Sequence, residues 1–443
     1  MFSFTSLDKC PSRLSISSVA MIKDDGKIVV ASPQTKGIIR FNEDSFKSFL
    51  DLEDKELSNV TSEVSSFKKF LEALIENRLV EEASTKGPAY KIVRIKAFLD
   101  SLPESVKKII LNPPFLPTVN VNERCKCNCP HCYNNTNQNV IQEMDVKTII
   151  NNAIKPLANM GCANIMWSGG DPVLTKNKTI SLTQAASSLG MSVATQATEF
   201  SKDFIEDFVK AGGKGIQFSL FASPSHPEID DQFRCRQGAW DMSVKNIIEA
   251  KKNGLSVFVN MILFRRNMDE LEETADFVFD LGVDTFRSSI PVIQGRAKTN
   301  KDRLTFSKEE VKKLMIKAIK LKKKYDCKMN VLTDISARTP KETPYSLCSA
   351  GLTYLHIAGY NVYPCNFLME DRFCAGSIHS DTVDKIWRFS STWQEFRKIE
   401  PINEKCISCK KRELFNPICT DCKAMMYMRY GKFFGRETVP CET

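Results

Sequence analysis

The chain has 443 residues, a formal net charge of +9 and 42% hydrophobic residues, so it is long enough to bury two or three cores. No stretch approaches the roughly 18 apolar residues of a membrane span, and no basic segment followed by an apolar one opens the chain. These features predict a multidomain cytoplasmic protein without a membrane partner. The densest basic run, at residues 320–328, falls on an expected helix, so charge does not indicate a nucleic-acid partner.

The first hundred residues predict a small unit of their own. A hairpin is expected at residues 18–32 around the turn Asp24 to Gly26, and a second one at 78–95 around Lys86-Gly87-Pro88. Two helices are expected between the hairpins. This order is typical of a winged-helix-like domain, which we place at residues 13–98, followed by a proline-rich linker.

Strand and helix patterns then alternate, which predicts an α/β domain at residues 113–335. Six strand-like stretches favour a parallel, partial (β/α)6 barrel rather than a full eightfold barrel, and they lie at residues 117–123, 163–168, 191–197, 215–221, 256–263 and 284–293. In such folds the chemistry is expected in the loops at the carboxyl ends of the strands.

Sixteen cysteines in a cytosolic chain indicate metal or redox chemistry, because the cytosol keeps thiols reduced. Twelve fall at residues 125–132 and 348–441, whereas Cys10, Cys162, Cys235 and Cys327 are isolated and expected to be small buried hydrophobes. Directly after the first barrel strand, Cys125, Cys129 and Cys132 form C-x3-C-x2-C. Zinc sites usually pair C-x2-C knuckles and ferredoxin clusters use four thiolates, whereas three thiolates on a [4Fe-4S] cluster leave one iron open.

This triplet, followed by Tyr133, resembles the signature of the radical S-adenosylmethionine (SAM) superfamily. The resemblance implies that the open iron binds SAM and that the cluster's electron generates a 5'-deoxyadenosyl radical, which abstracts hydrogen. The segment "SGGDP" is similar to the family's GGEP element, and the stretches "QFSLFAS" and "PVIQGRA" also match in order. The implied SAM contacts are Tyr133, Ser168, Gly169, Gly170, Asp171, Ser219 and Arg296.

Some residues near this signature receive no role in the chemistry. Cys127 is expected to point away from the three ligands and stays unassigned. Four further residues have the chemistry of a catalytic base, but we expect ordinary core or surface roles for them: Asp230, Asp231, His226 and His356.

The carboxyl-terminal cysteines resemble the SPASM (twitch) extension of radical SAM peptide-modifying enzymes, which we place at residues 345–443. The resemblance implies one auxiliary [4Fe-4S] cluster on Cys348, Cys365 and Cys422, and a second on Cys406, Cys409, Cys419 and Cys441. With the SAM cluster this makes three. The missing ligand of the first auxiliary cluster is Cys374, Cys327 or a substrate thiolate, or else the site stays open. A zinc ribbon built on the two C-x2-C pairs is the alternative.

Together these resemblances predict a maturase that cross-links a ribosomally made precursor peptide. The amino-terminal unit would bind the leader as an added strand, and the barrel would act on the core peptide. A flavodoxin or ferredoxin is the expected electron donor. Whether the link is a thioether, a carbon-carbon bond or an ether stays open. The alternatives are a protein oxidase similar to anaerobic sulfatase maturases, which needs no leader-binding unit, and a zinc-binding winged-helix regulator.

Overall fold

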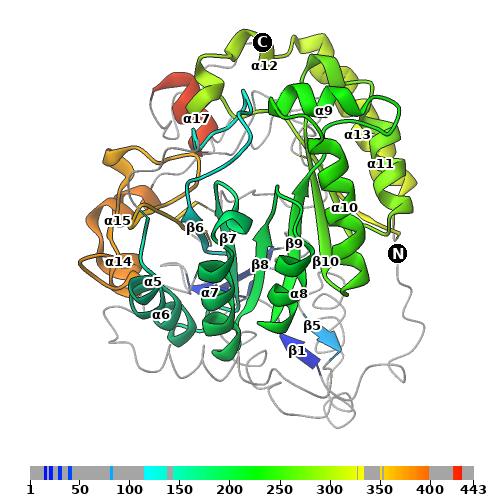
Figure 1. Cartoon of the computed structure of the whole chain (residues 1–443). Coiled ribbons are helices and arrows are strands. Elements are labelled where there is room, and N and C mark those ends of the chain that lie inside the picture. The colour runs from blue at the N-terminus through cyan, green and yellow to red at the C-terminus, as the bar shows by residue number, and fades with distance from the viewer. Residues whose placement is uncertain are drawn as a thin grey trace, which may run out of the picture.

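A ten-stranded sheet forms the centre of the protein in this computed structural model (Figure 1). The structure describes residues 114–136, 143–326, 328–333, 350–351, 354–398 and 423–431, together with five short strands between residues 14 and 82. The sheet order is β12-β11-β10-β9-β8-β7-β6-β13-β14-β15, so strands that follow one another in the barrel region are neighbours in space.

All six strands expected in the barrel are present and pair in parallel. They are β6 (Thr118–Asn122), β7 (Asn164–Gly169), β8 (Ser192–Gln196), β9 (Gly213–Ser219), β10 (Ser256–Ile262) and β11 (Thr285–Ser289). A seventh strand, β12 (Asn330–Thr333), continues the run by pairing in parallel with β11. The expected α/β fold with its six parallel barrel strands is confirmed, and the four-residue β12 extends the sheet at its edge.

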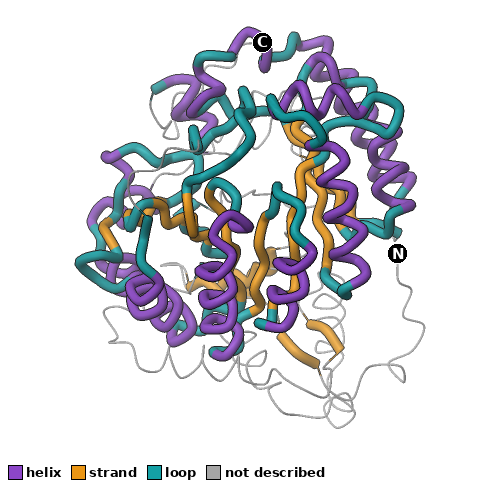
Figure 2. The backbone as a smooth tube through the Cα atoms, viewed as in Figure 1, coloured by secondary structure: helices purple, strands orange, loops and turns teal. Residues whose placement is uncertain are grey.

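The main helices cover the outer face of this sheet (Figure 2). They are α7 (Lys176–Ser188), α8 (Lys202–Lys210), α10 (Ala239–Lys252), α11 (Leu271–Asp280) and α13 (Lys308–Lys324). Helix α8 illustrates the local cause: the Ser201 side chain accepts a hydrogen bond from the Phe204 amide at the amino end, and Phe204 and Phe208 are buried on one face. The shorter α5 (Val146–Ile149) and α6 (Lys155–Asn159), joined by a π-helical turn, also pack on the main core. Helices α9 (Pro227–Arg234) and α12 (Lys301–Leu304) lie instead beyond the carboxyl ends of the strands, in a separate small apolar cluster (Figure 1).

The carboxyl-terminal unit shares its sheet and its core with the barrel. Strand β13 (His356–Ala358) pairs in parallel with β6, and β14 (Asn361–Tyr363) and β15 (Gly376–Ser377) extend the sheet in antiparallel fashion. Helices α14 (Val383–Phe389) and α15 (Ser391–Lys398) bring Trp387 and Trp393 into the main hydrophobic core, while α17 (Lys423–Tyr430) belongs to a smaller cluster around Cys365.

Five short strands represent the amino-terminal unit. The first expected hairpin is confirmed, since β2 (Val19–Ile22) pairs antiparallel with β3 (Ile28–Ala31), and β4 (Ile38–Phe41) adds a third strand. Strand β5 (Val80–Glu82) pairs with β1 (Leu14–Ile16). The remainder of the second hairpin and the expected helices lie outside the described residues. Within the described parts of the chain, no helix has the length and apolar character needed to cross a membrane.

Candidate functional site

The cysteine loop, residues 123–136, follows β6 at the carboxyl edge of the sheet and contains Cys125, Cys129 and Cys132. It contains no helix, and segments distant in sequence hold its backbone. The Asn128 amide donates to the Arg234 carbonyl at 2.9 Å, and the Arg296 amide donates to the Cys132 carbonyl at 3.0 Å. The three predicted ligands are thus brought into one short loop.

Arg296 holds this loop with its side chain as well. Its Nε donates to the Cys129 carbonyl at 3.0 Å and its Nη1 to the Thr136 carbonyl at 2.5 Å. The preceding Gly295 has φ +58°, and a Cβ there would lie 2.5 Å from the Cys132 carbonyl oxygen. Arg296 is therefore a positioning residue for the cysteine loop, and its contact with SAM stays a prediction.

Gly169, the last residue of β7, and Gly170, which follows it, lie directly against the end of β6. A Cβ on Gly169 would come within 2.0 Å of the Asn122 carbonyl oxygen, and one on Gly170 within 1.9 Å of the Arg124 carbonyl oxygen. The Gly170 amide donates to the Asn122 carbonyl at 3.0 Å. Both glycines are needed because backbone approaches backbone here, which leaves no space for a side chain.

Asp171 continues this connection toward β8. Its Oδ1 accepts hydrogen bonds from the Val173 and Thr198 amides at 3.2 Å each, and its Oδ2 accepts from the Glu199 amide at 2.7 Å. Burial raises the pKa of this carboxyl from 3.8 to about 7, although the hydrogen bonds from Thr198 and Val173 oppose the rise. The side chain is fully buried, so it ties two strand ends together, and its contact with SAM stays a prediction.

Tyr133 connects the cysteine loop to the carboxyl-terminal unit. The side chains of Asn366 and Ser168 hydrogen-bond with its hydroxyl, and burial raises its pKa. Its ring meets that of Phe367 edge-on, with 5.3 Å between the centroids. Ser168, predicted as a SAM contact, is buried beside it. Tyr133 therefore bridges Cys132 and the segment that carries Cys365.

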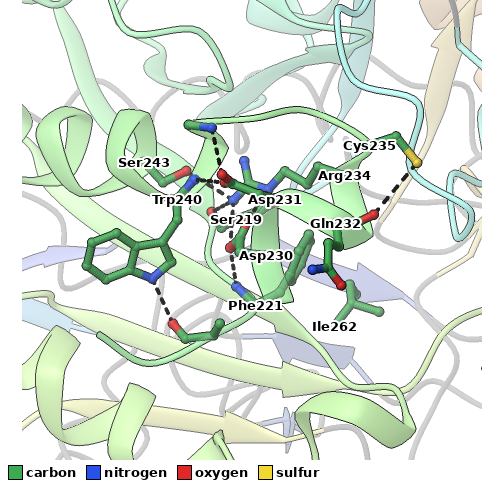
Figure 3. Close-up of polar contacts among 12 residues, drawn as sticks. Ser219, Phe221, Asp230, Asp231, Gln232, Arg234, Cys235, Trp240, Ser243 and Ile262 are labelled. Carbon is green, nitrogen blue, oxygen red and sulfur yellow. Dashed lines mark hydrogen bonds and ion pairs between the residues drawn. The ribbon is translucent and has the colours of Figure 1, made fainter. Parts of the chain in front are cut away.

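Ser219 ends β9, where its carbonyl oxygen accepts a hydrogen bond from Arg234 Nη2 (Figure 3). Only 2% of Arg234 is exposed, and its Nε lies 2.6 Å from Asp230 Oδ1. Its Nη2 also donates to Ser243 Oγ at 3.0 Å. The buried guanidinium thus joins β9, α9 and α10 just below the cysteine loop, and sequence reasoning assigned it no role.

The structure corrects the expectation for Cys127. Its side chain does not point away from the other thiols: it hydrogen-bonds with the thiols of Cys125 and Cys129, which lowers its pKa. Its amide also donates to Cys125 Sγ at 3.4 Å, because the chain reverses tightly within the loop. Cys127 is 4% exposed, and the guanidiniums of Arg234 and Arg236 favour its ionised form.

Glu199 anchors a second network that the sequence did not reveal. Its carboxylate is ion-paired with Arg236 and with Lys126, whose Nζ lies 3.1 Å from Oε2. The Asn246 side chain donates to the Glu199 carbonyl at 3.0 Å. Since Lys126 belongs to the cysteine loop and Glu199 follows β8, this network fixes the loop from a third side. No sequence motif marked these residues, because ion pairs between segments distant in sequence have no local signature.

The four residues with base chemistry all have structural partners. His226 lies 3.0 Å from Glu270, and Asp231 accepts hydrogen bonds from the Gly238 and Trp240 amides. His356 Nδ1 lies 2.7 Å from Thr118 Oγ1, and burial lowers its pKa to about 3. Asp230 binds Arg234. None of the four is assigned as a catalytic base.

The isolated cysteines differ from one another. Cys162 is buried, as expected, whereas Cys235 is exposed at the end of α9, which corrects that prediction. Its backbone is left-handed, with φ 52°, so the side chain turns outward where the helix ends. Cys10 and Cys327 lie outside the described residues.

Only part of the carboxyl-terminal cysteine set can be placed. Cys365 is buried and Cys374 is half-buried, and both belong to the smaller apolar cluster. The other predicted ligands lie outside the described residues: Cys348, Cys406, Cys409, Cys419, Cys422 and Cys441. Among the described residues, no three metal-binding side chains are close enough to hold a single ion. A [4Fe-4S] cluster distributes its thiolates over several irons, and the three thiols that one short loop brings together fit such a group.

The inward positions of the barrel strands are polar at the same edge of the sheet. Register places Gln196 beside Gln217 and Ser219 beside Asn260, while Arg287 lies beside Asn260 on the other side. Gln196 Nε2 donates to the Gly169 and Gly170 carbonyls at 3.2 and 3.3 Å. The apolar residues between these positions face the helices. The inner face therefore suits a polar ligand placed beside the cysteine loop.

Comparison with known proteins agrees with this geometry. Residues 119–278 match the family model of the radical SAM superfamily, and residues 348–423 match that of the SPASM iron-sulfur cluster-binding domain. An AdoMet-dependent heme synthase of Methanosarcina barkeri is 22% identical over 74% of this chain and 96% of its own length. A PqqA peptide cyclase of Rhizobium meliloti is 23% identical over 71% of this chain and 84% of its own length.

Among solved structures, the crystal structure of Streptococcus suis SuiB bound to the precursor peptide SuiA matches with a TM-score of 0.66 and 14% identity. The match covers 96% of this chain and 99% of SuiB. It therefore extends well beyond the segments that the two family models match.

The first prediction concerns the close contact at Gly170. Gly170→Ala should destabilise the protein by at least about 2 kcal/mol. The new Cβ would clash with backbone atoms of Arg124, which cannot move aside by changing rotamer as a side chain can. Gly215→Ala is the matched control, since its Cβ would lie 3.5 Å from its nearest neighbour. Urea unfolding of both variants measures the difference, and equal losses would contradict the contact.

The second prediction concerns the pH dependence of stability from Asp171. Because its pKa is higher in the folded than in the unfolded chain, its contribution is largest at low pH and falls as the pH rises from about 4 to about 7. Between about pH 5 and about pH 7 the stability difference between wild type and Asp171→Asn should fall by roughly 2 kcal/mol. Urea unfolding across this range measures it, and a constant difference would show that the pKa is not raised.

The third prediction concerns the buried pair of Arg234 and Asp230. Arg234→Met should cost about 3–5 kcal/mol of unfolding free energy, because it leaves a buried carboxylate without its counter-charge. The double variant Arg234→Met/Asp230→Asn should lose less, since the uncompensated charge is gone. Urea unfolding of the two variants tests the coupling, and an additive loss would argue against it.

Proposed function

Because the chain carries a radical SAM domain followed by a SPASM iron-sulfur cluster-binding domain, we propose that it is a maturase that installs an intramolecular cross-link in a ribosomally made precursor peptide. The observation that carries this proposal is the match over 96% of the chain to SuiB, a protein solved with its precursor peptide bound. The PqqA peptide cyclase among the relatives supports the same class of substrate.

In this proposal Cys125, Cys129 and Cys132 hold the catalytic [4Fe-4S] cluster. When bound, the cluster and SAM supply the radical that abstracts hydrogen from an unactivated carbon of the core peptide. The protein's own residues do the positioning: Arg296 and Arg234 hold the backbone of the cysteine loop, and Gly169 and Gly170 let the strand ends come together. Ser219 and the polar inner face beside it are proposed to receive SAM and substrate.

The auxiliary clusters follow the same resemblance. We assign Cys348, Cys365 and Cys422 to the first, and Cys406, Cys409, Cys419 and Cys441 to the second. Burial of Cys365 beside the bridge made by Tyr133 supports a first auxiliary site close to the cysteine loop. This arrangement would allow an auxiliary cluster to accept the electron released when the cross-link closes, with a flavodoxin or ferredoxin as the external donor.

The amino-terminal unit is proposed to capture the leader peptide. The sheet β2-β3-β4 has two edge strands, β2 and β4. An extended peptide can add to such an edge through backbone hydrogen bonds, while alternate side chains provide specificity. This unit favours a precursor peptide over the substrate of a sulfatase-type oxidase, and the radical SAM domain argues against a zinc-binding regulator. We place the enzyme in the cytoplasm.

The test combines iron content with the mass of the peptide product. Anaerobically reconstituted protein should hold about twelve irons per chain, falling to about eight when Cys125, Cys129 and Cys132 are all replaced by alanine. Incubation with SAM, a reductant and a precursor peptide encoded beside the gene should lower the peptide mass by two hydrogen atoms.

The triple variant should neither cleave SAM nor change the peptide, whereas Cys235→Ala, an exposed site outside the cysteine loop, should retain both activities. SAM cleavage with every candidate peptide unchanged would overturn the peptide assignment. It would turn attention to chemistry like that of the heme synthase relative. A content of about four irons per chain together with bound zinc would contradict the two auxiliary clusters.

A further inference from the structure

Cys127 is a fourth thiol within the group of predicted cluster ligands. It is 4% exposed, its amide donates to Cys125 Sγ at 3.4 Å, and its side chain hydrogen-bonds with the thiols of Cys125 and Cys129. A cysteine that served only to fill space would be expected to lie among apolar side chains. Instead, its thiol hydrogen-bonds with two of the residues assigned to the catalytic cluster.

Two guanidiniums lie near Cys127. They belong to Arg234 and Arg236, and both are fixed by other contacts. Arg234 is held by Asp230 and by Ser243 (Figure 3), and Arg236 by Glu199. A fourth thiolate adds a further negative charge to the cluster site, and two immobile cations on that side offset it.

The three thiolates of the triplet leave one iron of the cluster without a protein ligand. We propose that Cys127 ligates this iron in the SAM-free enzyme and that SAM displaces it. The exchange replaces one iron-sulfur bond by bonds from the amino and carboxylate groups of SAM, and no electron is transferred. The inference rests on the proposed function only in that Cys125, Cys129 and Cys132 hold the catalytic cluster.

Ligand exchange at this iron has a measurable consequence for SAM affinity. An enzyme in which the thiolate occupies the iron binds SAM more weakly, in proportion to the fraction of clusters left open. If about nine-tenths of the clusters carry the thiolate, Cys127→Ala should lower the dissociation constant of SAM about tenfold. The affected iron also changes its ligand, which alters the electron paramagnetic resonance of the reduced cluster.

The experiment compares reconstituted wild type, Cys127→Ala and Cys235→Ala in the full chain. SAM affinity is measured by equilibrium dialysis, and spectra of the dithionite-reduced protein are recorded with and without SAM. We expect tighter binding and a different SAM-free spectrum for Cys127→Ala alone, with all spectra coinciding once SAM is bound. Cys127→Ser keeps the size of the side chain and replaces the alanine variant in these measurements if the alanine variant does not fold.

Two outcomes would overturn the inference. Unchanged SAM affinity together with an unchanged SAM-free spectrum would show that Cys127 does not bind the iron. Loss of about four irons from Cys127→Ala would show that it is instead one of the permanent ligands. Neither measurement uses a peptide, so failure of the peptide assignment would leave this result standing. Failure of this inference would likewise leave the iron count and the peptide test intact.

Discussion

The backbone contact between the end of β6 and the glycine pair at the end of β7 is the constraint on which the cysteine loop depends. Gly169 and Gly170 leave no room for a side chain, and the Gly170 amide binds the Asn122 carbonyl directly. Where β6 ends and how the loop leaves the sheet are therefore set by its neighbour. Asp171 extends the constraint to β8 by accepting the Thr198 and Glu199 amides, so three consecutive strand ends become one rigid edge.

Two arginines then fix the loop from the far side of the barrel. The charge of Arg234 is buried beneath the loop, and the Arg234 carbonyl accepts a hydrogen bond from the Asn128 amide. The Arg296 side chain donates hydrogen bonds to the carbonyl oxygens of Cys129 and Thr136. Both arginines combine positioning with positive charge. This combination suits the iron cluster proposed for the loop, because the cations would lower the cost of gathering thiolates in a site with little water.

The carboxyl-terminal unit is part of the same framework. Strand β13 extends the barrel sheet beside β6, and Tyr133 reaches from the cysteine loop to Asn366 and Phe367. A domain that shares a sheet and a core cannot reorient freely. The segment carrying Cys365 therefore keeps its place relative to Cys132, which an electron-accepting cluster near the catalytic one would require.

Local sequence patterns were enough to predict the parallel α/β class, six barrel strands, the first amino-terminal hairpin and the position of the cysteine triplet after β6. These follow from local patterns, because strand alternation, turn residues and cysteine spacing are written in consecutive residues. The folded chain was needed to see that β12 joins the sheet, that Cys127 faces the other thiols, and that Arg234, Glu199 and Asp171 hold the site. Each of these depends on contacts between residues far apart in the chain, where burial and long-range pairing determine a side chain's role, and no local pattern records them.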